Sequence, residues 1–101
     1  TAISGCGPAY IFLMAEAMAR AGVELGLDPA LSERLANETL FGAAALLEHA
    51  WPEVDAQELR HRVTSPGGAT AAAIGKLQEN ELIAIVSEAA KAAQKRAEEL
   101  G

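Results

Sequence analysis

The first long apolar segment, residues 8–26, predicts a helix whose polar stripe is too narrow for an ordinary surface helix. Glu16, Arg20 and Glu24 lie four residues apart and therefore share one side of that helix. Apolar side chains occupy most of the remaining circumference: Tyr10, Ile11, Phe12, Leu13, Met14, Met18 and Val23. A helix of this kind needs burial nearly all round.

The second predicted helix makes the same demand, because residues 39–47 in its C-terminal half carry no charge. A chain of 101 residues buries only about 60–65% of the surface that its unfolded form exposes. Two helices that both need enclosure therefore favour a second copy of the chain as the covering surface. We expect a homodimer with interleaved helices. The alternative is a monomer in which three amphipathic neighbours cover them.

The composition favours an all-α fold, because 23 of the 101 residues are alanine and only 4% are aromatic. Proline, glycine and capping residues divide the chain into about five helices. The predicted helices cover residues 8–26, 29–51, 55–63, 69–79 and 81–100, with a kink or gap near Asn80. Asp28 and Asp55 are the expected N-caps of the second and third helices. In the fifth helix, the side chains expected to face inward are Leu82, Ile85, Val86, Ala89, Ala93 and Leu100.

The charge balance argues against several partners. The net charge is -6, so the chain lacks the positive surface that nucleic acid or an anionic membrane would require. No uncharged stretch reaches the roughly 20 residues needed to span a bilayer. A single cysteine cannot form an internal disulfide, which makes the cytoplasm the expected compartment. The first residue is Thr1 rather than Met, so we expect the chain to be a fragment.

Isolated reactive residues give weak signals. Cys6 lies between two glycines before a helix, where the helix dipole could activate a thiol, but a small buried residue in a tight turn explains it equally well. His49 and His61 are near the predicted C-terminal ends of the second and third helices and are expected to interact with the helix dipole or with solvent. Neither has a companion ligand, so no metal site is predicted.

The loop of residues 65–70 carries the strongest local signal, with Ser65, Pro66, Gly67, Gly68, Ala69 and Thr70 just before a predicted helix. Two glycines leave the backbone open, and the first N–H groups of the helix point into the loop. The Thr70 hydroxyl can both donate and accept. No Walker-type lysine is present, so one carboxylate fits better than a nucleoside triphosphate. The alternative is an ordinary turn between helices.

Two motifs together resemble a known family. Residues 4–10 read Ser-Gly-Cys-Gly-Pro-Ala-Tyr at the start of a long helix, and residues 63–70 read Val-Thr-Ser-Pro-Gly-Gly-Ala-Thr. The pair is similar to the C-terminal domain of pyrroline-5-carboxylate reductase over essentially the whole chain. The resemblance implies one helical dimerisation domain over residues 1–101, with the family's N-terminal Rossmann domain absent from this chain.

The family's activity supplies further expectations. The resemblance implies NAD(P)H-dependent reduction of 1-pyrroline-5-carboxylate to L-proline, the last step of proline biosynthesis. NADPH or NADH would bind the full-length enzyme, not this fragment, which we expect to be inactive alone. Carried over, Ser65, Gly67, Gly68, Ala69 and Thr70 bind the substrate, and Thr70 also acts in catalysis. The resemblance leaves open whether dimers assemble further.

The chain departs from the family pattern at three places. Cys6 stands where the family usually has serine, so a side-chain role there is not inherited. The connection around residues 49–55 is longer than usual, which makes Glu53 only a candidate for the family's acidic residue near the substrate. His61 stands where an acidic residue is common. The second hypothesis for the whole chain is a purely structural oligomerisation module without a ligand site.

Overall fold

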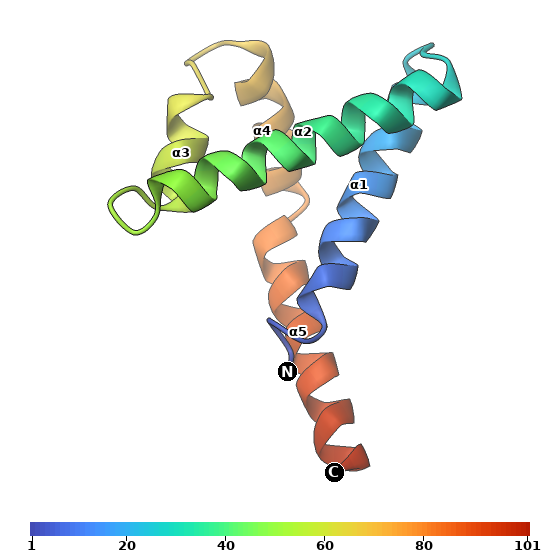
Figure 1. The fold of residues 1–101 in the computed structure, drawn as a ribbon, viewed down its shortest axis with the longest axis vertical. Helices are drawn as coiled ribbons and strands as arrows, with labels where there is room; N and C mark the ends of the chain where they lie inside the picture. The colour runs from blue at the N-terminus through green and yellow to red at the C-terminus, as the bar shows by residue number, and fades with distance from the viewer. The chain divides into compact units, whose positions relative to one another are not determined.

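The computed structural model describes all 101 residues and contains five α-helices and no strand, which confirms the all-α prediction (Figure 1). The helices are α1 (Gly7–Glu24), α2 (Pro29–Ala50), α3 (Ala56–Arg62), α4 (Ala69–Glu79) and α5 (Leu82–Leu100). Their ends lie close to the predicted ones. None of these helices combines the length and the apolar character that crossing a membrane requires.

Local capping explains why two of the helices begin where they do. The Asp28 carboxylate accepts a hydrogen bond from the Ala30 N–H at 3.1 Å, and Pro29 occupies the first helical position of α2. The Asp55 carboxylate accepts from the Glu58 N–H at 2.9 Å at the start of α3. Both aspartates therefore satisfy backbone donors that have no partner inside the helix.

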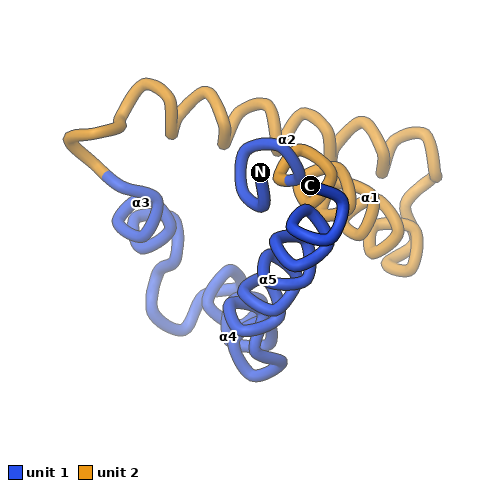
Figure 2. The backbone as a smooth tube through the Cα atoms, turned by 90° about the horizontal axis from the view of Figure 1, so that it is seen from below, with its two compact units in different colours: residues 1–6, 55–101 blue, residues 7–54 orange.

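The chain divides into two compact units, which are coloured separately in Figure 2. Unit 1 comprises residues 1–6 and 55–101 and so contains α3, α4 and α5. Unit 2 comprises residues 7–54 and contains α1 and α2.

Unit 2 is a helical hairpin in which α1 and α2 pack closely near their connecting turn (Figure 1). Small residues form this contact. Ser32 and Ala36 on α2 are buried, and the Ser32 hydroxyl donates a 2.6 Å hydrogen bond to the carbonyl oxygen of Ala19 on α1. The predicted polar stripe of α1 is present, with Arg20 and Glu16 forming an exposed ion pair at 2.6 Å.

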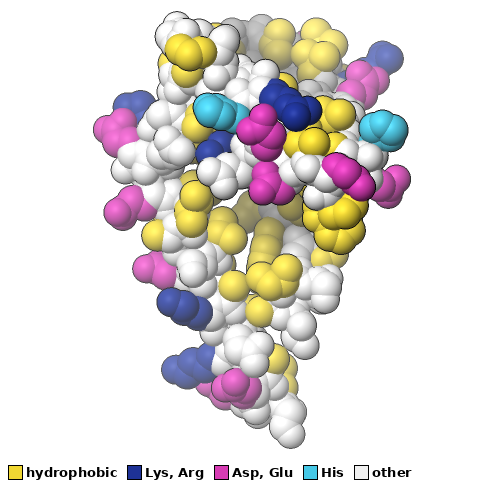
Figure 3. Space-filling view, turned by 90° about the vertical axis from the view of Figure 1, so that its left-hand side faces the viewer, with side chains coloured by type: hydrophobic (Ala, Val, Ile, Leu, Met, Phe, Trp, Pro, Cys, Tyr) yellow, Lys and Arg dark blue, Asp and Glu magenta, His cyan; other side chains and the backbone are white.

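Most large apolar side chains of the single chain remain uncovered. Ser32 and Ala36 are the only buried residues, whereas Phe12 is 70% exposed and Phe41 is 65% exposed. Figure 3 shows hydrophobic side chains at the surface among the charged ones. The chain by itself therefore encloses neither α1 nor the C-terminal half of α2.

The prediction that six side chains of α5 face inward is wrong for four of them in the single chain. Ile85, Val86, Ala89 and Leu100 are exposed, whereas Leu82 and Ala93 are half-buried. Within unit 1, α5 has only a limited contact with α4, which has 11 residues against the 19 of α5. A helix of that length cannot cover the full face of α5.

Candidate functional site

The loop of residues 65–70 forms a tight turn that leads directly into α4. The Gly68 N–H donates to the Ser65 carbonyl oxygen at 3.1 Å, which closes the turn. Gly67 has a φ of +74°, a conformation that side chains disfavour. The loop therefore needs glycine at position 67.

Gly68 is constrained by its neighbour rather than by its own dihedral angles. A Cβ atom on this residue would lie 2.9 Å from Ser65 Oγ and 3.2 Å from the Ser65 carbonyl oxygen. Gly68 is also the N-cap of α4, and no side chain caps this end of the helix. Position 68 therefore has no room for a side chain unless Ser65 moves.

The first turn of α4 offers three backbone donors. The first helical hydrogen bond runs from the Ala72 N–H to the Gly68 carbonyl oxygen at 3.1 Å. The N–H groups of Ala69, Thr70 and Ala71 precede it and have no acceptor within the helix. Ala69 and Thr70 are exposed. Unpaired N–H groups at a helix N-terminus carry partial positive charge and favour an anion.

Two more polar groups flank the loop on the α3 side. His61 and Arg62 line a small surface hollow together with Ser65 and Pro66. The Arg62 guanidinium forms an exposed ion pair with Glu58 at 3.3 Å. The Thr64 hydroxyl donates to the Arg60 carbonyl oxygen at 2.5 Å and is therefore engaged in ending α3. Ser65 and Thr70 are both exposed, and the Thr70 hydroxyl belongs to the same helical turn as the free N–H groups.

The predicted substrate-binding residues lie together in the structure, and their role in binding stays a prediction. Ser65, Gly67, Gly68, Ala69 and Thr70 all lie within this one turn and the start of α4. Glu53 is exposed and belongs to unit 2, whereas the loop belongs to unit 1. The Cys6 thiol is free and half-buried. The roles of Glu53 and Cys6 stay predictions.

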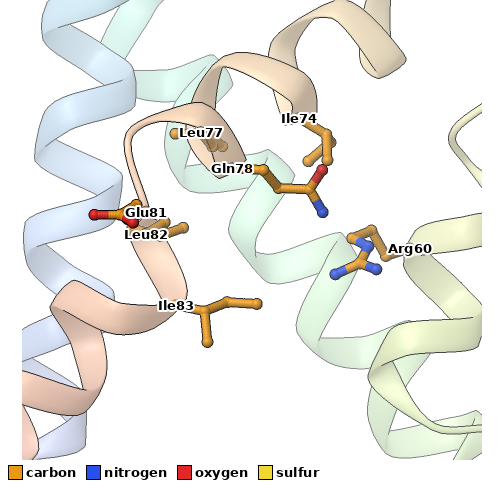
Figure 4. A pocket seen from close by; sticks show the side chains of 7 residues that line it. All are labelled: Arg60, Ile74, Leu77, Gln78, Glu81, Leu82 and Ile83. Carbon is orange, nitrogen blue, oxygen red and sulfur yellow. The ribbon is translucent and has the colours of Figure 1, made fainter.

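A second hollow, of about 340 Å³, was not predicted from the sequence. It lies between α3, α4 and the start of α5, and Figure 4 shows the side chains around it. Its lining residues are Arg60, Ile74, Leu77, Gln78, Glu81, Leu82 and Ile83. Apolar residues on both sides of the break at Asn80 and Glu81 were the signal that could have indicated it.

Comparison with known proteins gives consistent matches. The family model for pyrroline-5-carboxylate reductase dimerisation matches residues 1–100. The chain is 48% identical to the pyrroline-5-carboxylate reductase of Pseudomonas aeruginosa, with 99% of this chain and 36% of that protein covered. It is 41% identical to the enzyme of the same name from Synechocystis, with 100% and 37% covered. The chain thus spans little more than a third of the length of these relatives.

A solved structure resembles this chain in fold as well as in sequence. The crystal structure of the Plasmodium falciparum pyrroline carboxylate reductase, which has NADP bound, superposes with a TM-score of 0.91 at 37% identity. The alignment covers 100% of this chain and 40% of that one. These matches confirm the resemblance seen in the two sequence motifs, and the chain belongs to the pyrroline-5-carboxylate reductase dimerisation family.

Proposed function

We propose that this chain is the helical dimerisation domain of a pyrroline-5-carboxylate reductase and that it carries the loop that binds the substrate's carboxylate. In this proposal residues 1–101 form one domain, and a separate Rossmann domain supplies the nicotinamide cofactor. The observation that carries the proposal is the uncapped N-terminus of α4, with Thr70 exposed beside it. The enzyme would work in the cytoplasm, as expected of a chain with one free thiol.

The exposed apolar surface supports a homodimer, in which a second copy of the chain covers that surface. Only two residues of the chain are buried, and both lie in the contact between α1 and α2. An extensive exposed apolar surface of this kind is typical of protein interfaces. Interleaving of two copies would cover α1, the C-terminal half of α2 and the face of α5. A two-fold arrangement would also place two 65–70 loops in each dimer.

The proposed substrate, 1-pyrroline-5-carboxylate, is a cyclic imine with one carboxylate. The N–H groups of Ala69 and Thr70 would hold that carboxylate, because charge-assisted hydrogen bonds at a helix N-terminus favour an anion. The Thr70 hydroxyl would hydrogen-bond the ring nitrogen and so orient the C=N carbon. Gly67 and Gly68 would keep the loop compact, because Gly67 has a positive φ and a side chain on Gly68 would meet Ser65. Hydrogen bonds of this kind contribute roughly a few kcal/mol of binding free energy. Their main effect would be to orient the substrate.

The five helices of this chain do not include the strand-turn-helix unit of a Rossmann-type dinucleotide site. Dinucleotide binding of the Rossmann type uses a glycine-rich turn between a strand and a helix. All five regular elements are helices, so none of the glycine-containing segments between or before them follows a strand. In this proposal a separate domain would hold NADPH or NADH, and hydride transfer would rely on the cofactor bound there.

Substitution of Thr70 in the whole reductase tests the proposed role. Thr70→Val removes the hydroxyl while keeping the branched shape, and we expect kcat/KM to fall by about 10- to 100-fold with the dimer intact, because orientation of the ring nitrogen is lost. Thr70→Ser keeps the hydroxyl and should retain most of the activity. Unchanged kinetics of Thr70→Val would refute the assignment.

A purely structural oligomerisation module is the second candidate, and one observation favours it. Gly67 is required by its positive φ and Gly68 by its contact with Ser65, so the turn is explained without a ligand. Titration of the isotope-labelled chain with L-proline distinguishes the two. A ligand site predicts shifts of the backbone amides of Gly68, Ala69 and Thr70 at millimolar proline. A structural module predicts that these amides do not move while the chain remains dimeric.

A further inference from the structure

We propose that the hollow between α3, α4 and α5 receives Phe41 from α2 of a second copy, and that Glu48 of that copy pairs with Arg60 at the rim. This inference rests on the proposed dimer and specifies which two surfaces meet in it. By two-fold symmetry each dimer would contain the contact twice.

The hollow has the size and lining for an aromatic side chain. Its volume of about 340 Å³ exceeds the ~150 Å³ at which an apolar cavity holds a benzene ring. Four of its lining residues are aliphatic: Ile74, Leu77, Leu82 and Ile83. Ile83 is 73% exposed in the single chain, so a ring placed here would remove apolar surface from water.

Arg60 gives the hollow a charge that the chain itself does not compensate. Its guanidinium extends from α3 toward Gln78, whereas the Glu81 carboxylate points away from the hollow (Figure 4). The five ion pairs of the chain use Arg20, Arg34, Arg62, Lys76 and Arg96, so Arg60 takes part in none of them. An apolar segment with a free carboxylate is therefore the complementary occupant.

The C-terminal half of α2 meets both requirements. Phe41, Ala44, Ala45 and Glu48 lie on one side of the helix, because positions 0, 3, 4 and 7 share a face. The two alanines allow another surface to approach closely beside the Phe41 ring. Glu48 takes part in none of the ion pairs, and it lies about 10 Å along the helix from Phe41.

The helix α1 also exposes an aromatic side chain, but it fits the hollow less well than α2 does. The N-terminal half of α1 also exposes a phenylalanine, Phe12. Its first acidic residue is Glu16, which is already paired with Arg20 at 2.6 Å. Because α1 has no free carboxylate next to its exposed ring, the charge on Arg60 favours α2.

Disulfide formation between chains tests the proposed contact. In a Cys6→Ser background, chains carrying Phe41→Cys are co-expressed with chains carrying Ile83→Cys or Ile74→Cys, and the purified dimer is mildly oxidised. A disulfide requires Cα atoms within about 7 Å. We expect a covalent heterodimer with at least one of the two hollow positions. Leu25→Cys, at a residue that is 86% exposed in the turn after α1, is the matched control and should not crosslink to them.

Three results would overturn the inference. The first is that, in a dimeric protein, Phe41→Cys crosslinks to the hollow no faster than the Leu25→Cys control. The second is that Phe12→Cys crosslinks to the hollow and Phe41→Cys does not. A chain carrying both Phe41→Cys and Ile83→Cys could also close on itself without joining a second chain. A chain that light scattering finds to be monomeric would instead refute the proposed dimer, and this inference with it.

Charge reversal tests the ionic part independently. We expect Arg60→Glu or Glu48→Arg alone to weaken the dimer by about two- to tenfold, because an attraction becomes a repulsion at a partly exposed pair. Combining the two restores the pairing and should recover most of that affinity. Lys91→Glu is the control, because it changes the net charge by as much as Arg60→Glu does. Glu48→Arg should not restore the dimer affinity of the Lys91→Glu variant. If the combined variant is no tighter than either single variant, Glu48 does not pair with Arg60.

Discussion

Gly22 on α1 faces the hydroxyl of Ser32 on α2 so closely that any side chain on Gly22 would overlap Ser32 Oγ. Ser32 is one of the two buried residues, and its hydroxyl is held by the carbonyl oxygen of Ala19 at 2.6 Å. The hairpin of unit 2 thus depends on the absence of a side chain on one helix and a short polar side chain on the other.

Gly22→Ala is expected to destabilise the fold by about 1–3 kcal/mol, because the new methyl group forces the two helices apart. Thermal or denaturant unfolding measures the loss. Gly75→Ala is the matched control, since a Cβ atom there meets nothing within 4 Å. That control should be neutral or stabilising by up to ~1 kcal/mol.

Adding Ser32→Ala to Gly22→Ala should recover part of the lost stability. A Cβ atom on Gly22 would overlap the Ser32 hydroxyl first, whereas it would lie 3.1 Å from the Ser32 Cβ. Ser32→Ala alone should cost about 1 kcal/mol through its lost hydrogen bond. A double variant whose loss equals the sum of the single losses would contradict this contact.

Gly67→Ala should lower stability by about 1–2 kcal/mol, because φ is +74° at this position. The substitution also distorts the loop that holds Ser65 and Thr70, so the binding of L-proline should weaken in parallel. Unfolding curves and amide titrations measure the two effects. Gly67→Asn should lose less of both, since asparagine tolerates the left-handed conformation better than alanine.

Glu81→Gly should stabilise the chain by about 0.5–1 kcal/mol. Glu81 has a φ of 58°, and it is the non-glycine residue with a positive φ between α4 and α5. The steric cost of that conformation exceeds the added chain entropy of glycine. Glu88→Gly, in the interior of α5, should instead destabilise by up to ~1 kcal/mol. Equal effects of the two substitutions would argue against strain at Glu81.

The mass of the chain in solution should be about twice that of one copy at micromolar concentration, because α1, α2 and α5 all expose apolar surface. Light scattering across a dilution series measures this mass. The midpoint of thermal unfolding should also rise with chain concentration, as it does when folding and association are linked. A stable monomer with a concentration-independent midpoint would contradict the dimer.

Local chemistry made the helices predictable from the sequence. Asp28 and Asp55 act on N–H groups two or three residues away, and Pro29 fixes a dihedral angle of its own, so their effects are visible in a short stretch of residues. The 65–70 loop was predictable for the same reason. Its glycines, its turn and the donors of α4 all lie within a few residues of one another.

The tertiary structure alone decided which apolar faces remain uncovered. The apolar periodicity of α5 predicts that Ile85 and Val86 face inward, but the short α4 leaves them exposed. The hollow beside Arg60 could not be predicted in this way, because its lining comes from three separate helices. The sequence determined where each helix begins and ends and which faces are apolar, because hydrogen bonds and side-chain periodicity act within a few residues. Whether those faces find cover depends on contacts between distant segments, which only the folded chain specifies.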